Sequence, residues 1–231
     1  DSVSVIKSSA VLTVTYSGYF KAVRNVEVTE GKSAFFRIQL LKAESIGSFS
    51  SGSGGSVRHP LGWGIDFLPG SIVNPSNQQL YTGTVTVRAQ WLDPTRADLI
   101  QVMPGDLRAI DAQGAATFLS SFGMMGVELI GSAGEALQLG NNQKAMLHFP
   151  IPSSLQNNAP SRIPLWHFND NTGLWMEEGF ATQTGNSYLG EVSHFSFWNV
   201  DIPNLSISVR LKLISMQGQP IPGMLVKLTD A

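Results

Sequence analysis

The sequence predicts an all-β protein built from antiparallel β-sandwiches. Short stretches of alternating apolar and polar residues recur along the chain, and this is the pattern of half-buried strands. Glycine, proline and asparagine separate these stretches at near-regular intervals, and no segment shows a sustained helical period. Hydrophobic residues occupy 42% of the 231 positions, which is enough for the core of one large or two small domains. We therefore expect one sandwich, or two in tandem.

The N-terminal segment is expected to consist of strands and turns. Alternating residues predict strands at 3–5, 11–15, 23–28 and 34–41, with turns at 17–19 and 29–32. The stretch 48–56 that follows contains only serine, glycine and one phenylalanine, and this composition predicts a flexible linker or a mobile loop. A domain boundary near 43–56 follows, with one domain over 1–43 and a central one over 46–202.

The central part continues with strand signals. Strands are predicted at 64–68, 83–92, 108–110, 125–130, 144–149, 163–168, 174–180 and 188–198. We expect a single helical turn at 98–103, because Pro104 stops it. The segment Asn169–Gly173 lies between two tryptophan-bearing strands. It predicts a hairpin loop, since Asn, Asp and Gly tolerate left-handed backbone angles.

The C-terminal residues 205–231 predict the beginning of another domain. A strand at 205–213 and a second one at 224–228 flank a turn-forming cluster at 217–223. Because a hairpin alone is only marginally stable in water, these strands need partners from elsewhere. Neighbouring domains of the same polypeptide are the expected partners. An exposed edge strand that pairs with another copy of the chain is a further expectation.

The composition excludes several classes of partner and site. Only 14% of residues are charged, the formal net charge is -2 and no Lys/Arg cluster occurs, so nucleic acid and anionic membranes are not expected partners. The absence of cysteine excludes disulfides, thiolate metal sites and cysteine nucleophiles. No apolar run reaches membrane-spanning length and the N-terminus lacks a leader, so we expect a soluble piece of a longer protein with no membrane insertion.

The segment Tyr188–Asn199 has two interpretations. In the first it is an aromatic-rich strand whose side chains alternate between two faces. In the second, the hydroxyl of Ser196 attacks the carbonyl of Phe195, the peptide bond becomes an ester, and water splits it with His194 as the base. Self-cleavage also requires a strained peptide and an oxyanion donor. We expect the strand, and we keep His194 and Ser196 as the catalytic candidates for a cut after Phe195.

For the tryptophans, aspartates and other histidines we mainly expect structural roles. Most tryptophans lie in apolar strands and are expected in a core, whereas Trp63, between two glycines, is the candidate for an exposed sugar-binding aromatic. Four aspartates between 93 and 111 suit calcium by chemistry but not by spacing, so solvated turns are expected instead. The remaining histidines look isolated, and no metal or cofactor site is predicted: His59, His148 and His167.

The terminal segments resemble halves of the carboxypeptidase regulatory-like, transthyretin-like β-sandwich. Residues 218–226, Gly-Gln-Pro-Ile-Pro-Gly-Met-Leu-Val, resemble its opening strand-turn-strand, and residues 17–23 and 26–31 resemble its closing strands. The middle of that fold is absent. The resemblance implies that 1–43 is the C-terminal part of one such sandwich and that 205–231 is the N-terminal hairpin of a second.

The centre of the chain, about 47–203, resembles a group of bacterial surface proteins and cartilage intermediate layer proteins. This group is similar to the tandem β-sandwiches of netrin receptors and ankyrins. The resemblance implies an extracellular, non-enzymatic module within a much longer multidomain protein. The matching segments are Gly54–Val57, Phe67–Gly70, Thr82–Val87, Asp93–Pro94, Met103–Asp106, Ser121–Gly123, Pro164–Trp166, Gly173–Gly179 and Val192–Asn199.

The triplet His-Phe-Ser has a known meaning in relatives of this tandem fold and in a self-cleaving nucleoporin, where it marks autoproteolysis between Phe and Ser. His194, Phe195 and Ser196 match it residue by residue. The bacterial modules that this chain resembles carry the same segment without a known need for cleavage.

The sequence therefore predicts a non-catalytic structural or display module of a secreted or surface-anchored bacterial multidomain protein. Sandwiches stacked through short linkers such as 202–204 form semi-rigid rods without any reactive group. Two alternatives remain open. The first is an adhesion or glycan-binding module, and the second is a module that cleaves itself between Phe195 and Ser196.

Overall fold

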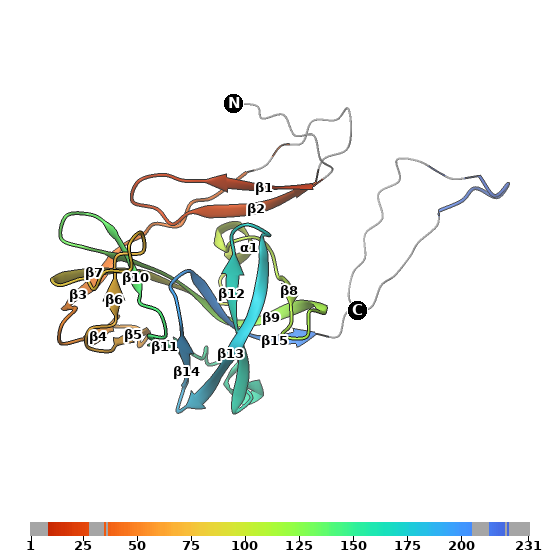
Figure 1. The fold of residues 1–231 in the computed structure, drawn as a ribbon. Coiled ribbons are helices and arrows are strands. Elements are labelled where there is room, and N and C mark those ends of the chain that lie inside the picture. The colour runs from red at the N-terminus through yellow and green to blue at the C-terminus, as the bar shows by residue number, and fades with distance from the viewer. Residues whose placement is uncertain (1–8, 28–34, 36, 205–212, 220, 222–231) are drawn as a thin grey trace.

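The computed structural model describes residues 9–27, 35, 37–204, 213–219 and 221, and it confirms an all-β chain with antiparallel sheets (Figure 1). The helical elements of the described residues are the short α1 (Leu99–Val102), at the predicted helical turn, and the 3-10 turn η1 (Gln156–Asn158). No helix in this part of the chain is long and apolar enough to cross a membrane. The strands are β1 (Ser9–Val14), β2 (Ala22–Glu27), β3 (Ser45–Ser50), β4 (Gly55–Arg58), β5 (Gly64–Phe67), β6 (Ile72–Val73), β7 (Thr84–Leu92), β8 (Arg108–Ile110), β9 (Ala116–Ile130), β10 (Ala136–Leu139), β11 (Ala145–Pro150), β12 (Arg162–Asn169), β13 (Leu174–Thr184), β14 (Ser187–Val192) and β15 (Phe197–Asn204).

Most central strands belong to one continuous hydrogen-bonded path, in the order β3-β7-β9-β15-β12-β13-β14-β11-β5-β4. Neighbours along this path are antiparallel, and the short β8 adds a parallel pair with β13. The two ends of the path meet at the turn between β3 and β4, where Ser50 and Gly54 form an isolated bridge. The long strand β9 pairs with β8 at its start and with β7 at its end, so it joins these two strands into one sheet (Figure 1).

The buried apolar side chains form two clusters, which we call the first core and the second core. Alternation along β7 sends Val85, Val87 and Ala89 into the first core, as a two-residue period requires, while Leu92 at its end enters the second. The first core includes Ile65, Ile72, Leu129, Leu147, Phe149, Tyr188 and Trp198. The second core includes Phe20, Val23, Val102, Met103, Met124, Trp166 and Trp175.

The flexible linker or mobile loop predicted at 48–56 is wrong, because this stretch is the end of β3, the start of β4 and the tight turn that joins them. Phe49 is buried and stacks on Phe67, with ring centroids 4.1 Å apart. Ser51 is also buried, and it exchanges hydrogen bonds with Gly83: its N–H donates to the Gly83 carbonyl and its hydroxyl accepts the Gly83 N–H. A serine whose polar groups are paired in this way can be buried, although the composition of the stretch 48–56 suggests a linker.

The hairpin loop predicted at Asn169–Gly173 is confirmed. Strands β12 and β13 pair antiparallel down to Asn169 and Leu174, and the N–H of Gly173 donates to the carbonyl of Asn169 over 2.8 Å. Gly173 has φ +68, the left-handed region that favours glycine. The Asn169 side chain accepts the N–H of Asn171, which closes the loop as an Asx turn.

The predictions for the terminal segments are tested only in part. The strand predicted at 34–41 is wrong for residues 35 and 37–41, which form no strand, and Tyr19 instead bridges Lys42. The turn near Gly218 is present. The predicted strands at 3–5 and 224–228, and residues 205–212 of the one predicted at 205–213, lie outside the described residues. The division into domains at 1–43, 46–202 and 205–231 stays a prediction.

Candidate functional site

The candidate cleavage segment lies in a bend between β14 and β15, so the continuous strand predicted at 188–198 is wrong. The cause is a change of pairing partners. Strand β14 pairs with β13 and β11, whereas β15 pairs with β12 and β9. The chain bends at Ser193–Ser196 to pass from one pair of neighbours to the other.

The peptide groups of Phe195 are held by Gln138, a residue of β10 that the sequence did not single out. The N–H of Phe195 donates to Oε1 of Gln138 over 2.6 Å, and Nε2 of Gln138 donates to the carbonyl of Phe195 over 3.1 Å. The Phe195 ring is buried against Phe67. Attack on this carbonyl would place negative charge on the oxygen that already accepts the Gln138 hydrogen bond, so one oxyanion donor is present.

The other two cleavage candidates have different partners. The hydroxyl of Ser196 donates to the carbonyl of Phe197 over 3.1 Å. Nε2 of His194 faces Glu178, with 3.6 Å between Nε2 and Oε2. In this arrangement the hydroxyl is bonded to the carbonyl that follows it in the chain, and the imidazole faces a carboxylate. The structure thus brings together the carbonyl and its donor, while nucleophile and base are engaged elsewhere.

A second histidine lies beside His194, so the prediction that His167 is isolated is wrong. The two imidazole centroids are 4.9 Å apart, and Oε2 of Glu178 lies close to both rings. Nδ1 of His167 lies 3.0 Å from Oε2 of Glu178. The three residues come from β12, β13 and the bend after β14, so no local sequence spacing announces the cluster. Only the pairing of β12 with β13 and β15 brings them together.

Partial burial favours the neutral form of the His167 imidazole. Burial lowers the pKa of His167, and the neighbouring His194 ring lowers it further, while the carboxylate of Glu178 acts in the opposite direction. The buried Nδ1 atom has no hydrogen-bond partner, because its 3.0 Å contact with Glu178 lacks hydrogen-bond direction. An imidazole nitrogen without a hydrogen-bond partner is a candidate metal ligand.

The remaining histidines also have partners. His148 lies 2.6 Å from Oδ2 of Asp66, and the Arg58 guanidinium is 2.9 Å from its Nε2. His59 stacks on Trp63, with centroids 4.4 Å apart. The Trp63 ring itself is only 2% exposed, so the predicted exposed sugar-binding aromatic is wrong at this position. The indole belongs to the first core instead.

The four aspartates between 93 and 111 serve turns or pair with arginines. Asp93 and Asp111 accept backbone N–H groups two residues ahead, which confirms the turns expected for them. Asp98 pairs with Arg96. Burial alone would raise the pKa of Asp106, but the hydrogen bonds and charge of Arg108 outweigh it, so the pKa is lowered.

Asp201 is a buried carboxyl group that the sequence analysis missed. It lies in β15 where the register with β9 shifts, and Oδ1 accepts the N–H of Phe122 over 3.2 Å. The Asn199 amide donates to its other oxygen. Burial raises the pKa of Asp201 to about 8, against the lowering effect of these donors and of Ser121. Its nearby partners are backbone and neutral groups, which indicates a structural role in completing the β-bulge.

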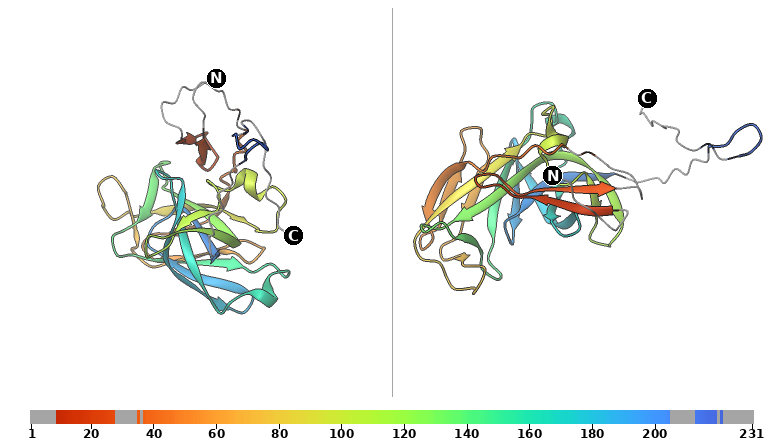
Figure 2. Two further views of the ribbon diagram at one scale, coloured as in Figure 1. Left: turned by 90° about the vertical axis from the view of Figure 1, so that its right-hand side faces the viewer. Right: turned by 90° about the horizontal axis from the view of Figure 1, so that it is seen from above.

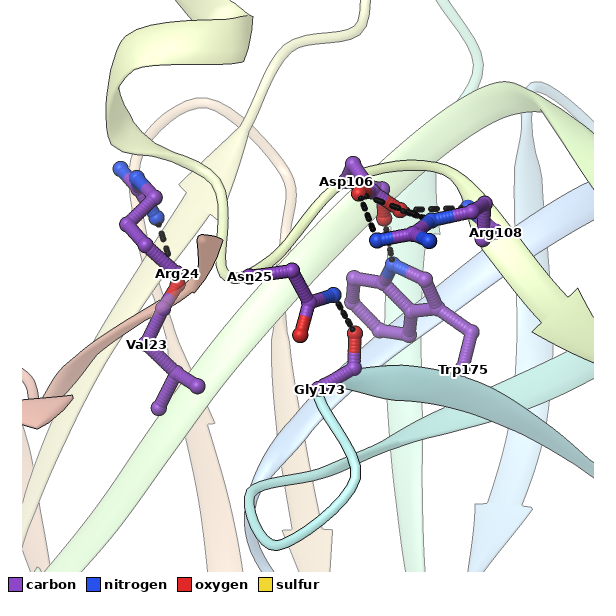
Figure 3. Close-up of polar contacts among 7 residues, drawn as sticks. All are labelled: Val23, Arg24, Asn25, Asp106, Arg108, Gly173 and Trp175. Carbon is purple, nitrogen blue, oxygen red and sulfur yellow. Dashed lines mark hydrogen bonds and ion pairs between the residues drawn. The ribbon is translucent and has the colours of Figure 1, made fainter. Parts of the chain in front are cut away.

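The N-terminal hairpin docks on the central strands through backbone-directed contacts (Figures 2 and 3). Val23 is fully buried in the second core, and its carbonyl accepts the N–H of Gly105 over 2.8 Å. The side-chain amide of Asn25 donates to the carbonyl of Gly173 over 2.7 Å. Trp175, drawn beside them in Figure 3, donates its indole N–H to the carbonyl of Asp106. The hairpin and the centre therefore share both apolar packing and hydrogen bonds.

We call the contact between β2 and the central strands the junction. On the central side it includes α1, the loop after α1 and the β12–β13 loop. Two charged residues of the hairpin reinforce it. The guanidinium of Arg24 donates to the carbonyls of Gln101 and Met103 at the end of α1. Lys21 pairs with Asp170 in the β12–β13 loop. Arginine suits this place because its planar fork meets two carbonyls at once.

Comparison with known proteins finds similarity to cartilage intermediate layer proteins. The chain is 32% identical to cartilage intermediate layer protein 1 of Sus scrofa over 116 residues, which is 48% of this chain and 18% of that protein. It is 32% identical to cartilage intermediate layer protein 2 of Homo sapiens over 124 residues, 52% of this chain and 10% of that protein. For the Mus musculus protein 2 the figures are 30% over 146 residues, 63% and 12%. The chain thus spans less than a fifth of the length of these relatives.

No family model matches the chain, and no solved structure matches it.

Proposed function

We propose that this chain is a non-catalytic structural module of a secreted or surface-anchored multidomain protein, which spaces or displays the domains beside it. The observation that carries the proposal is the junction, where Val23, Arg24 and Asn25 fix the N-terminal hairpin on the central strands. A spacer has to transmit orientation from one domain to the next. A shared core with directed hydrogen bonds does so better than a flexible linker.

The similarity to cartilage intermediate layer proteins supports this proposal. The relatives are named for a layer of cartilage, a tissue built largely of extracellular material, and an extracellular location for this chain follows as part of the proposal. The low content of charged residues, 14%, agrees with a module that serves neither nucleic acid nor an anionic membrane. A bacterial parent protein and the regulatory-like identity of 1–43 and 205–231 stay predictions.

A hollow in the described part of the chain offers no catalytic group. One hollow of about 240 Å³ is lined by Arg37, Gln39 and Gln101, which hold no nucleophile or general base. Glycan adhesion, the first alternative, loses its candidate because Trp63 is buried. The sheet of β1 and β2 has two strands, and pairing of its edge with another copy stays a prediction that light scattering at high concentration would test.

Loosening the junction is expected to free the hairpin without unfolding the centre. The double variant Arg24→Ala with Asn25→Ala removes the three hydrogen bonds that cross the junction to backbone carbonyls, each worth about 1 kcal/mol. Amide hydrogen exchange in β1 and β2 should accelerate about 10-fold or more, while exchange in β9 stays the same. Arg162→Ala, which changes an exposed arginine stacked on Phe180, is the matched control and should leave the hairpin unaffected. A hairpin that is unprotected already in the unchanged chain would refute the proposed rigid junction.

Self-cleavage is the second candidate function, and the hydrogen bond from Gln138 to the Phe195 carbonyl is the observation that favours it. Because Ser196 and His194 face other partners, we expect freshly purified protein to be intact, with the full mass of 24.9 kDa. Hydroxylamine, which cleaves esters, should release no fragments, and Ser196→Ala should behave identically. Mass spectrometry decides the question. Two fragments that meet between Phe195 and Ser196, and that vanish in Ser196→Ala, would establish self-cleavage.

A further inference from the structure

The cluster of His167, Glu178 and His194 brings three metal-binding groups to one place on the sheet. The ligand atoms of the three side chains all lie within 4.8 Å of one another. Oε2 of Glu178 is 3.0 Å from Nδ1 of His167 and 3.6 Å from Nε2 of His194. Bonds of about 2.0 to 2.2 Å to a tetrahedral ion would place its ligand atoms about 3.3 to 3.6 Å apart, and the two distances of 3.0 and 3.6 Å lie close to this range.

The contact between Glu178 and His167 is close but poorly directed. Nδ1 of His167 is buried and lacks a hydrogen-bond partner, although the carboxylate oxygen is 3.0 Å away. Two lone-pair-bearing atoms at this distance repel each other unless a proton or a cation lies between them. The direction of the contact is poor for a hydrogen bond, so a cation would satisfy the pair better than a proton on Nδ1 does.

We propose that His167, Glu178 and His194 bind a divalent transition-metal ion, with Zn²⁺ as the natural occupant. Two imidazoles and one carboxylate form a ligand set that zinc accepts, and water completes the fourth position. The cluster is accessible, because each of its side chains is partly exposed: 22% for His167, 41% for Glu178 and 34% for His194. An ion that binds His194 and Glu178 from solvent would reach the buried Nδ1 of His167 last.

The surroundings of the cluster orient its ligands. The hydroxyl of Ser193 donates to Oε1 of Glu178 over 2.6 Å, which leaves Oε2 directed at the two imidazoles. The indole N–H of Trp198 donates to the carbonyl of His194 over 2.9 Å, and both imidazoles lie against the Trp198 ring. Such outer contacts fix ligand orientation in metal sites.

The proposed ion would connect β12, β13 and the bend before β15, and so hold the candidate cleavage segment in place. A His194 whose Nε2 binds a metal cannot accept a proton from Ser196, so the site also opposes self-cleavage. This inference goes beyond the proposed structural function and does not depend on it, since a spacer module works with or without the ion.

Metal binding by the full chain, purified without a histidine tag and stripped with a chelator, tests the inference. Calorimetric titration with Zn²⁺ is expected to saturate at one equivalent per chain. Co²⁺ is expected to give the intense visible absorption of a tetrahedral site, and Zn²⁺ should displace it. His194→Gln and Glu178→Gln should each weaken binding at least about 10-fold, and Ser193→Ala should weaken it by about 10-fold through the orientation of Glu178.

His148→Gln is the matched control, because His148 is also a partly buried histidine with a carboxylate at 2.6 Å but carries Arg58 beside it. It should bind Zn²⁺ as the unchanged chain does. Near-ultraviolet circular dichroism of the tryptophans verifies that each variant is folded. The inference is overturned if the unchanged chain shows no saturable binding of Zn²⁺ or Co²⁺, or if folded His194→Gln binds Zn²⁺ with unchanged affinity.

Discussion

Replacing Trp166 with alanine is expected to lower the free energy of unfolding by about 3 to 5 kcal/mol. Trp166 is fully buried in the second core, on β12 between β13 and β15, and its removal leaves a cavity that the sheet cannot close. The change also deprives the carbonyl of Asp201 of the indole N–H, which donates to it over 3.1 Å. Urea unfolding followed by circular dichroism measures the loss as a lower midpoint at similar slope.

Phe180→Ala is the matched control for this prediction. Phe180 lies on the neighbouring strand β13 but is 45% exposed, where it stacks under Arg162. Its loss should cost less than about 1 kcal/mol, because little apolar area leaves a core. Equal effects of the two substitutions would show that Trp166 does not occupy the core described.

The stability of the unchanged chain is expected to fall as pH rises from about 4 to 8, because of Asp201. Burial raises the pKa of Asp201 to about 8 in the folded state, whereas an unfolded aspartate titrates near 4. Between these values the folded chain holds a proton that the unfolded chain has released. Unfolding therefore becomes more favourable with rising pH, and the loss is complete above the folded pKa. Since one pKa unit corresponds to about 1.4 kcal/mol, the effect is on the order of 5 kcal/mol.

Asp201→Asn should flatten this pH dependence, since an amide does not titrate in this range. Burial also raises the pKa of Glu128, whose contribution has the same sign, so the comparison between the two chains isolates Asp201. Glu191→Gln, at an exposed ion pair with Lys144, is the control and should keep the slope. Urea unfolding at several pH values gives the curves. Parallel curves for the unchanged chain and Asp201→Asn would contradict the prediction.

Local patterns were sufficient to predict the class of the fold and several of its elements. The alternation in β7 and the Asn169–Gly173 loop depend on residues close in sequence, and both are confirmed. At 48–56 the high content of serine and glycine led to the wrong prediction of a linker. The fully buried Ser51 satisfies its polar groups with the backbone of Gly83, a partner 32 positions away. Hydrogen bonding between distant residues leaves no local signature.

The candidate sites depended even more on contacts between distant segments. Gln138 binds Phe195 across 57 positions, and no sequence motif around either residue indicates this contact. Asp201 was the one missed residue with a visible signal, a carboxylate within the apolar run of β15, and burial is what such a position implies. His167, Glu178 and His194 had no such signal.

From the sequence alone came the all-β class, the antiparallel character of its sheets and the cysteine-free chemistry, because side-chain period and composition are local properties. The tertiary structure decided which strands are neighbours. That choice bent the chain at Ser193–Ser196, placed His194 against Glu178 and His167, and turned Trp63 inward. The physical reason is that strand order follows from the burial of whole faces, which is summed over the entire chain rather than read from any one segment.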